Sequence, residues 1–394
     1  MNPSDNVTNV LMVVGICGGG LGRHVRSLSE GLVERGHRVT VVYTPHTVDQ
    51  AFQRFVDGRR HEIRFVPLKI RREISSASDL RAVVRLVRLI WREGPFDVVH
   101  GHSAKGGAIA RIVGRLFGMP TVYTPHGLIM SSPKISKAEN FIYTLIERIL
   151  GRLATSRLIA VSEDESELGN KLTLVRKDRI VVIENAVDDE DFDRLAKEPF
   201  YGNLDQKPLT FGSTMRFSIQ KAPDHLIGAF IRLSSALPQL EMRLVIVGDG
   251  ELLAQARRQV EASGLAEKIQ FLGWRTSVKE LLREFDIFVI SSLYEAGLSY
   301  SSMEAMAAKL PIVSTRVFGA EGTLSKIPGN ILVPVGDPGA LADSLQRMAT
   351  LADPGSLREA LQRIGQANHD YAREHFRQSE TTRRTVEVYR ALKR

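Results

Sequence analysis

The sequence predicts an α/β protein made of two doubly wound domains, each a parallel sheet with helices on both faces. Three observations favour this class. The chain has 394 residues, which is too long for one ordinary domain and suits two. Short β-branched apolar segments alternate with helical patterns in both halves, as in parallel βαβ units. A glycine-rich turn, GGGLG at residues 18–22, follows the first apolar segment, where such folds pass from strand to helix.

The N-terminal half contains the first series of strands and helices. Its predicted strands cover residues 10–14, 38–43, 63–67, 96–100, 120–123, 157–162 and 180–183. Its predicted helices cover residues 23–35, 80–91, 104–117 and 137–153. Gly36 directly follows the first helix, at a position where glycine commonly ends helices.

A second series begins after residue 207. Residues 188–207 are charged and show no periodicity, which predicts a linker. The strands expected beyond it cover residues 209–212, 243–247, 269–272, 287–290 and 312–314, with helices between them. Both halves therefore carry the strand–helix alternation of a parallel sheet.

Composition is that of an ordinary globular protein, with 43% hydrophobic and 25% charged residues. Cys17 is the single cysteine, so no internal disulfide is possible, and this fits a reducing compartment. Residues 1–8 are polar, and no apolar stretch approaches the roughly 20 residues that span a bilayer. We therefore expect a cytoplasmic protein without a signal peptide.

Positive charge is concentrated in the N-terminal part of the chain. The net charge is +8, but residues 1–160 hold 23 Lys or Arg and 12 Asp or Glu, a net charge of +11. A helical pattern there aligns four arginines on one stripe, preceded by further basic residues: Arg81, Arg85, Arg88 and Arg92, and before them Arg59, Arg60, Lys69, Arg71 and Arg72. The stripe is either a solvated helix face or an attachment site for anionic lipid headgroups. Nucleic acid is disfavoured, because no aromatic residues interleave with the arginines.

The most informative segment runs from residue 291 to residue 319. Glu295 follows the predicted strand at 287–290, and Gly297, Leu298 and Ser299 lead into a helix at 301–307. Free N–H groups at a helix start favour a phosphate. Glu304 lies about one turn inside the helix, where its carboxylate can accept hydrogen bonds from a sugar hydroxyl. Ligands of open α/β sheets bind at the carboxyl ends of strands, which is where this segment lies.

This segment resembles the nucleotide-sugar site of retaining GT-B glycosyltransferases, specifically glycosyltransferase family 4. The family pattern is Glu, seven residues, Glu and then Ala-Met-Ala, and its second half fits Glu304 and residues 305–307. Glu295 precedes Glu304 by nine positions, and Ala296 occupies the position that the family spacing gives to the first glutamate. Either the loop has one extra residue and Glu295 fills the role, or the first carboxylate is lost. We favour the extra residue.

Arg216 and Lys221 follow the first strand of the second half, where the family carries Arg and Lys. Isolated basic residues are usually solvated, but the matching position and spacing favour a role here. The resemblance implies that both cations stabilise the diphosphate leaving group, as a metal ion does in other enzymes.

Two histidines end neighbouring predicted strands. The resemblance places His126 near the donor sugar and His102 on the acceptor side, whereas His100 is interpreted as a packed strand residue. The His-x-His pattern could suggest a metal, but no cysteine or carboxylate cluster completes a ligand set, and no D-x-D signature is present outside the linker. We therefore expect neither a metal nor another cofactor.

Several glycines mark the remaining loops of the resemblance. Residues 18–22 lack the last glycine of G-x-G-x-x-G, and no acidic residue ends the second strand, so NAD binding is disfavoured. In the resembling family this loop faces the donor phosphates and the acceptor. The resemblance assigns the following residues: Gly20, Gly248 and Gly273 to the donor, and Gly19 to the acceptor side.

The resemblance implies a GT-B arrangement of two Rossmann-like domains facing a cleft. Residues 1–190 would bind the acceptor, residues 191–207 would form the linker, residues 208–375 would bind the nucleotide sugar, and residues 376–394 would form a helix that packs back on the N-terminal domain. The implied function is a retaining, metal-independent glycosyltransferase. It would move a sugar from a nucleotide-diphosphate sugar to a hydroxyl acceptor.

The resemblance extends to members that assemble bacterial exopolysaccharide, which points to a lipid-linked glycan acceptor. The positive charge of residues 1–160 and the arginine stripe favour peripheral attachment at the inner, anionic face of the cytoplasmic membrane. Two alternatives stay open. One is a non-hydrolysing nucleotide-sugar epimerase of the same fold. The other is a catalytically silent nucleotide-sugar-binding protein.

Overall fold

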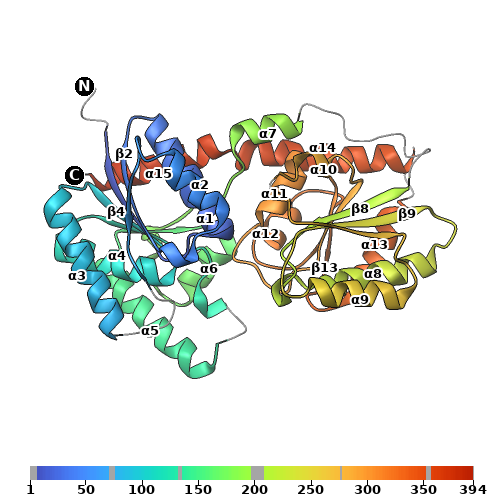
Figure 1. The fold of residues 1–394 in the computed structure, drawn as a ribbon, viewed down its shortest axis with the longest axis horizontal. Helices are drawn as coiled ribbons and strands as arrows, with labels where there is room; N and C mark the ends of the chain where they lie inside the picture. The colour runs from blue at the N-terminus through green and yellow to red at the C-terminus, as the bar shows by residue number, and fades with distance from the viewer. Residues whose placement is uncertain are drawn as a thin grey trace. The chain divides into compact units, whose positions relative to one another are not determined.

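The computed structural model describes residues 7–70, 76–131, 135–196, 208–275, 277–351 and 356–393. The chain forms two compact units (Figure 1). Unit 1 comprises Met1–Asn185 together with Gln378–Arg394, and unit 2 comprises Ala186–Arg377. The predicted residues Arg71 and Arg72, and residues 197–207 of the predicted linker, lie outside the described residues.

Unit 1 contains a seven-stranded parallel sheet in the order β3-β2-β1-β4-β5-β6-β7. Its strands are β1 (Asn9–Val14), β2 (Arg38–Tyr43), β3 (Arg64–Pro67), β4 (Val98–His102), β5 (Thr121–Thr124), β6 (Arg157–Ala160) and β7 (Ile180–Val182). The chain runs outward from β1 to β2 and β3, then returns to β4 on the other side of β1. This reversal makes the boundary between β1 and β4 the topological switch point of the sheet, where open α/β folds bind ligands.

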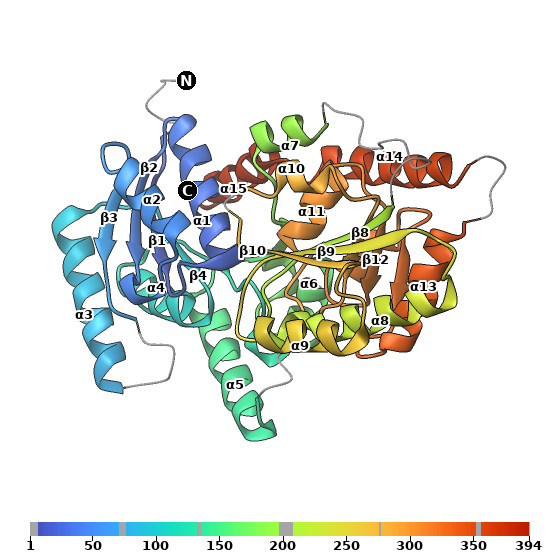
Figure 2. The same ribbon diagram turned by 45° about the vertical axis from the view of Figure 1, so that its right-hand side comes forward.

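Helices cover both faces of this sheet. They are α1 (Gly19–Glu34), α2 (Gln50–Gly58), α3 (Ser76–Glu93), α4 (Ala104–Leu116), α5 (Lys137–Ala154), α6 (Glu163–Lys171) and α15 (Gln378–Leu392). Helices α1, α2 and α15 pack on one face, and α3, α4 and α5 lie side by side on the other (Figures 1 and 2). Strand β1 shows the reason, because its alternate side chains belong to two different apolar clusters: Val10, Met12 and Val14 to one, Leu11 and Val13 to the other.

Unit 2 contains a six-stranded parallel sheet in the order β10-β9-β8-β11-β12-β13. Its strands are β8 (Leu209–Thr214), β9 (Met242–Val247), β10 (Ile269–Gly273), β11 (Ile287–Ile290), β12 (Ile312–Thr315) and β13 (Ile331–Val333). Its helices are α7 (Asp189–Ala196), α8 (Pro223–Ala236), α9 (Leu253–Ser263), α10 (Lys279–Leu282), α11 (Tyr300–Ala307), α12 (Ala320–Leu324), α13 (Pro338–Ala349) and α14 (Leu357–His375). The switch point of this sheet lies between β8 and β11.

The structure differs from the sequence-based prediction in five places. Helices α2 and α6 and strand β13 were not predicted. Helix α1 begins at Gly19, so most of the predicted glycine-rich loop is the first turn of the helix. Residues 189–196 of the predicted linker form α7, which buries Phe192 and Leu195 in unit 2. The linker prediction was wrong there because two apolar residues suffice to anchor such a short, acidic helix.

Candidate functional site

Lys221 and Glu295 meet at the switch point of unit 2. Lys221 ends a short 3-10 helix (Ile219–Lys221) after β8, and Glu295 follows the neighbouring strand β11. The Lys221 ammonium forms a salt bridge with the Glu295 carboxylate, and the Gln220 Nε2 atom donates to the same carboxylate at 3.3 Å. The exposed fractions are 21% for the Lys221 side chain and 10% for Glu295. Lys221, expected to bind the diphosphate, and Glu295, expected to bind the sugar, therefore lie together, and each side chain is mostly buried but partly exposed.

Backbone contacts hold the two loops in this arrangement. The Leu293 N–H donates to the Gln220 carbonyl at 2.7 Å, and the Ser291 hydroxyl donates to the Lys221 carbonyl at 2.8 Å. Gln220 Nε2 also donates to the Tyr294 carbonyl at 2.9 Å. Because these bonds join the loops after β8 and β11, Gln220, the residue before Lys221, sets the position of Glu295.

Arg216 lies earlier in the loop after β8. Its side chain is exposed and makes no hydrogen bond or ion pair with any residue that the structure describes. Its guanidinium thus keeps all its donors available to an anion from solvent.

The start of α11 has the expected geometry. Ser299 is the N-cap residue, and its hydroxyl accepts a hydrogen bond from the Ser302 N–H at 3.2 Å. Glu304 is half-buried in the second turn. Gly319, with φ +78°, lies so close to the loop that a Cβ atom there would be 1.9 Å from the Leu298 nitrogen. The Gly297–Leu298 turn is therefore packed directly against the backbone that follows β12.

Two of the predicted donor glycines lie on neighbouring loops of the same sheet edge. Gly248 follows β9 with φ +140°, and a Cβ atom there would be 1.8 Å from the Met215 carbonyl oxygen. Its N–H donates at 2.9 Å to the carbonyl of Gly273, which ends β10. The loops after β8, β9 and β10 are thus stacked closely, and only glycine allows that approach at residue 248.

The switch point of unit 1 carries a cluster of histidines. His102 ends β4, His126 follows β5, and His24 comes from α1. His102 Nδ1 and His126 Nε2 are 3.1 Å apart, and the ring centroids of His24 and His126 are 4.6 Å apart. The two histidines predicted from the sequence are therefore brought together. His24 was missed, and its only signal was its position two residues after the last glycine of the turn.

Burial keeps these imidazoles neutral. It lowers the pKa of His24 to about 4, and it lowers the pKa values of His102 and His126 well below the ordinary range. His100 is a packed strand residue, hydrogen-bonded at 2.6 Å to the Tyr389 hydroxyl and at 2.7 Å to the Thr124 hydroxyl. His102 Nε2 is buried and has no hydrogen-bond partner in the described part of the chain. A neutral imidazole in this position can donate to or accept from a sugar hydroxyl.

The same three histidines are the group most suited to a metal ion. One nitrogen atom from each of His24, His102 and His126 lies within 4.8 Å of the others. Within the described residues, no Asp, Glu or Cys joins this group as a further ligand. Three neutral imidazoles can ligate Zn²⁺, but the bond between His102 and His126 would have to break first.

Glu165 fixes the backbone around His126. His126 has φ +55°, a left-handed conformation that is uncommon outside glycine. Glu165, buried on α6, accepts hydrogen bonds from the Gly127 and Val161 N–H groups, each at 2.8 Å, and a further one from the Leu128 N–H. Burial nevertheless raises the pKa of Glu165 to about 7. Sequence reasoning missed this residue, because it lies on a helix that was not predicted.

Gly19 and Gly20 are exposed at the start of α1. The Gly19 N–H donates to the Asp49 carboxylate at 2.9 Å, so a carboxylate already occupies one donor of this helix start. Both predicted glycines therefore lie at the carboxyl end of β1, at the same edge as the histidine cluster.

Comparison with known proteins identifies the family. Residues 18–191 match the model of Glycosyltransferase Family 4, and residues 207–350 match that of Glycosyl transferases group 1. The chain is 31% identical over 293 residues to the UDP-Gal:alpha-D-GlcNAc-diphosphoundecaprenol alpha-1,3-galactosyltransferase of Escherichia coli, an alignment that covers 72% of this chain and 74% of the relative. The chain belongs to glycosyltransferase family 4. This family 4 chain is a glycosyltransferase, as the sequence predicted.

Further relatives agree with this assignment. The phosphatidyl-myo-inositol mannosyltransferase of Mycobacterium leprae is 25% identical over 330 residues, covering 83% of each chain. Among solved structures, Anabaena HepE in complex with UDP and glucose superposes with a TM-score of 0.76 at 17% identity, covering 98% of this chain and 100% of that chain. The likeness confirms the predicted GT-B fold with two Rossmann-like domains.

Proposed function

We propose that this glycosyltransferase moves a sugar from a nucleotide-diphosphate sugar to a hydroxyl of a lipid-linked glycan, in bacterial polysaccharide synthesis. The observation that carries the proposal is the Lys221–Glu295 pair at the switch point of unit 2, with Arg216 nearby in the same loop. A cation, a carboxylate and a capped helix start at one sheet edge suit a diphosphate joined to a sugar.

The relatives favour the same substrates. The Escherichia coli relative is named for transfer from UDP-Gal to a diphosphoundecaprenol-linked sugar, and Anabaena HepE was solved with UDP and with UDP-glucose. A UDP-sugar is therefore the first donor to test, and an undecaprenyl-diphosphate sugar is the first acceptor.

The proposed reaction follows a front-face route with retention of configuration. The bond between the anomeric carbon and the diphosphate oxygen breaks, and the acceptor oxygen bonds to that carbon on the same face. The acceptor proton passes to the departing diphosphate oxygen. Arg216 and Lys221 stabilise the charge that develops on the diphosphate, Glu295 binds sugar hydroxyls, and Glu304 holds the ribose.

Arg216 and Lys221 also motivate a proposal of metal independence. In the proposed complex these two cations neutralise the diphosphate, as a metal ion does in other enzymes. We expect full transfer in excess chelator. Activity that is lost in chelator and restored by Mg²⁺ or Mn²⁺ would contradict this proposal.

Lys221→Ala tests the site directly. Losing one charge-assisted contact to the leaving group costs about 2–4 kcal/mol of transition-state stabilisation, so kcat/KM is expected to fall roughly 30- to 1000-fold. The assay measures transfer of radiolabelled sugar to a membrane extract. Lys279→Ala is the matched control, because it breaks another half-buried Lys–carboxylate pair of unit 2, with Asp191, on α10 and α7. Equal turnover of Lys221→Ala and Lys279→Ala would show that Lys221 does not stabilise the leaving group.

Glu295→Gln tests the role of the carboxylate, and assays of the parent protein separate the proposed transferase from the two alternatives. The variant is expected to bind the nucleotide diphosphate in calorimetry as the parent does, yet to transfer sugar poorly. Donor binding without any transfer by the parent protein would indicate a silent nucleotide-sugar-binding protein. Conversion of the donor to its epimer without an acceptor would indicate the epimerase. The anomeric configuration of the product, measured by NMR, tests retention.

The proposal also includes attachment to an anionic membrane face. In the described part of the chain, no helix combines the length and apolarity needed to cross a bilayer. Arg81, Arg85, Arg88 and Arg92 of α3 are all exposed, as a headgroup-binding stripe requires.

A further inference from the structure

Helix α5 turns a row of large apolar side chains toward solvent. Their exposed fractions are 69% for Phe141, 50% for Ile142, 47% for Leu145, 48% for Ile149 and 67% for Leu153. Phe141, Leu145, Ile149 and Leu153 follow one another at four-residue spacing, and Ile142 comes three residues before Leu145, so all five lie on one side of the helix. Such a row of exposed apolar side chains marks an interaction surface.

The opposite side of the same helix is polar and buried. Glu147 accepts two hydrogen bonds, at 2.7 and 2.9 Å, from the guanidinium of Arg111 on α4, and both residues are buried. The Tyr123 hydroxyl donates to the same carboxylate at 3.3 Å. This charged pair fastens α5 to α4, so the apolar row cannot be the side that packs on the sheet. The buried side of α5 carries small or polar residues, Thr144, Glu147, Gly151 and Ala154, whereas large apolar residues face solvent.

Helix α4 also exposes apolar side chains. It lies beside α5, and it exposes Ile112, Leu116 and, just beyond its end, Phe117. We call these three residues and the five of α5 the α4–α5 face. Both helices belong to unit 1, and Figure 2 shows α5 extending beyond the sheet that it covers.

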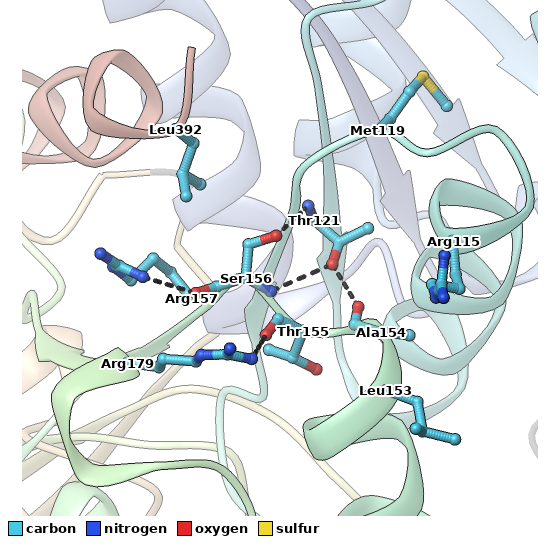
Figure 3. A pocket seen from close by; sticks show the side chains of 10 residues that line it. All are labelled: Arg115, Met119, Thr121, Leu153, Ala154, Thr155, Ser156, Arg157, Arg179 and Leu392. Atoms are coloured by element: carbon cyan, nitrogen blue, oxygen red, sulfur yellow. Dashed lines mark hydrogen bonds between the residues drawn. The ribbon is translucent and has the colours of Figure 1, made fainter. Parts of the chain in front are cut away.

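A basic pocket adjoins this face at the carboxyl end of α5 (Figure 3). Its volume is about 260 Å³, and Leu153 of the α4–α5 face lines it together with Arg115, Arg157 and Arg179. The Arg157 and Arg179 guanidiniums donate to the backbone carbonyls of Ser156 and Thr155, at 2.9 and 3.1 Å. None of the three arginines forms a salt bridge with a residue that the structure describes. Guanidinium donors thus remain for an anion such as a phosphate.

The charge around the face is positive. Helices α3, α4 and α5 carry ten Arg or Lys and four Asp or Glu. Three of the four acids form salt bridges, Asp79 with Lys105, Glu93 with Arg64 and Glu147 with Arg111, and Glu139 accepts hydrogen bonds from Ser136. An apolar row bordered by uncompensated arginines complements an anionic lipid bilayer, which offers hydrocarbon and phosphate at one surface.

We propose that the α4–α5 face docks on an anionic bilayer, with its apolar side chains in the headgroup–acyl boundary and a lipid phosphate in the arginine pocket. This surface differs from the arginine stripe of α3. The inference rests on the proposed function, because docking through this face would bring unit 1 to the surface where a lipid-linked acceptor resides.

Vesicle sedimentation without any nucleotide sugar tests the proposal, so its outcome does not depend on whether the proposed transfer occurs. The full chain is mixed with vesicles of phosphatidylcholine alone or with phosphatidylglycerol, at low and high salt. We expect binding to the anionic vesicles that weakens with salt. The double variant Phe141→Ser/Leu145→Ser is expected to bind about tenfold or more weakly, because two large side chains can no longer be buried.

Three further variants sharpen the result. Val335→Ser replaces an exposed apolar residue of unit 2 and is expected to bind like the parent. Arg115→Gln removes a pocket cation and is expected to weaken binding to anionic vesicles only. Glutamine at all four α3 arginines tests the other surface, and loss of binding in this variant alone would overturn the proposal.

Circular dichroism shows whether each variant folds, so that weaker vesicle binding can be told apart from unfolding. Sedimentation velocity tests whether the face instead joins two copies of the chain. A parent dimer that becomes a monomer in Phe141→Ser/Leu145→Ser, with no vesicle binding by either protein, would overturn the membrane assignment.

Discussion

At the scale of single residues, Glu165 holds the strained backbone that presents His126. Both of its oxygens accept backbone N–H bonds, from Gly127 and from Val161. In Glu165→Gln one of these oxygens becomes an NH₂ group, which faces an N–H donor and leaves it unpaired. An unpaired buried donor costs about 1–3 kcal/mol, so we expect a lower unfolding temperature and a shifted His126 loop.

The control for this substitution is on the same helix. Glu163→Gln changes an exposed glutamate in the first turn of α6 and is expected to leave stability unchanged. Thermal unfolding of both variants measures the difference in stability. Equal unfolding temperatures for the two variants and the parent would show that Glu165 does not support the loop.

His24 makes the stability of unit 1 depend on pH. Its pKa is about 4 in the folded chain against an ordinary value of 6.5, so the folded state binds fewer protons than the unfolded state between these values. Its contribution is therefore complete above pH 6.5 and is lost as the pH falls toward 4. Glu165, with its raised pKa, has the opposite sign, because its contribution is lost as the pH rises toward about 7. The two effects oppose each other in the parent protein.

A substitution isolates the histidine effect. The cost of His24→Gln is expected to be smaller at pH 5 than at pH 7 by about 2 kcal/mol, because the parent alone loses the His24 contribution. Hydrogen exchange of peptides from α1 and β4, corrected for the chemical exchange rate, measures this difference. His46→Gln, at an exposed position of the same unit, is the matched control. A His24→Gln cost that is the same at both pH values would refute the effect.

Sequence patterns located those site residues that follow strands. His102, His126, Lys221 and Glu295 all lie at or after the carboxyl end of a predicted strand, where ligands of open sheets bind. His24 and Glu165 lie on helices, and their positions in the site follow from tertiary packing that no local pattern encodes. Glu295 lies one residue away from the family spacing, and its carboxylate forms a salt bridge with Lys221 among the loops at the switch point of unit 2.

At the scale of elements, Gly319 controls how closely the loops after β11 and β12 approach. Gly319→Ala adds a Cβ atom that would lie 1.9 Å from the Leu298 nitrogen, so the Gly297–Leu298 turn must move. We expect a loss of stability of about 3 kcal/mol or more, from the left-handed φ together with the displaced turn, and weaker donor binding.

Gly336→Ala is a close control for the backbone cost alone. Its φ is +77° and a Cβ atom there meets nothing within 4 Å, so only the cost of about 1–2 kcal/mol for the left-handed conformation is expected. Urea unfolding compares the two variants. An equal loss of stability in Gly319→Ala and Gly336→Ala would show that the close contact with Leu298 adds nothing to the free-energy cost of the substitution.

Three of the elements that the sequence failed to predict, β13, α6 and α7, have a weak apolar pattern, whereas the missed helix α2 buries Phe52, Phe55 and Val56. Strand β13 has three residues, and α6 buries only Glu165 and Gly169. Helix α7 opens with three acidic residues and buries two apolar ones. The predicted strands β1 and β9, in contrast, are six-residue runs that are mainly apolar and almost wholly buried, and such runs identify parallel strands even without knowledge of their neighbours.

At the scale of the whole molecule, unit 1 is completed by the last segment of the chain. Helix α15 packs on α1, where the Thr382 side chain fills the space that a Cβ atom at Gly31 would need. The Tyr389 hydroxyl bonds to buried His100, and Val386 joins the apolar cluster below α1. Residues more than 280 positions apart in sequence thus share one core, so unit 1 cannot be complete without α15.

Deletion of residues 378–394 should therefore destabilise unit 1 selectively. The truncated chain loses the burial of Val386 and Tyr389 and leaves His100 Nδ1 without its partner, which together cost about 4 kcal/mol or more. Arg377 is retained, since it pairs with Asp189 within unit 2. Hydrogen exchange should show lost protection in α1 and β4 and unchanged protection in β8 and β11. Arg383→Ala, on the exposed side of α15, should change neither unit. Protection of α1 that survives the deletion would mean that unit 1 folds without its last helix.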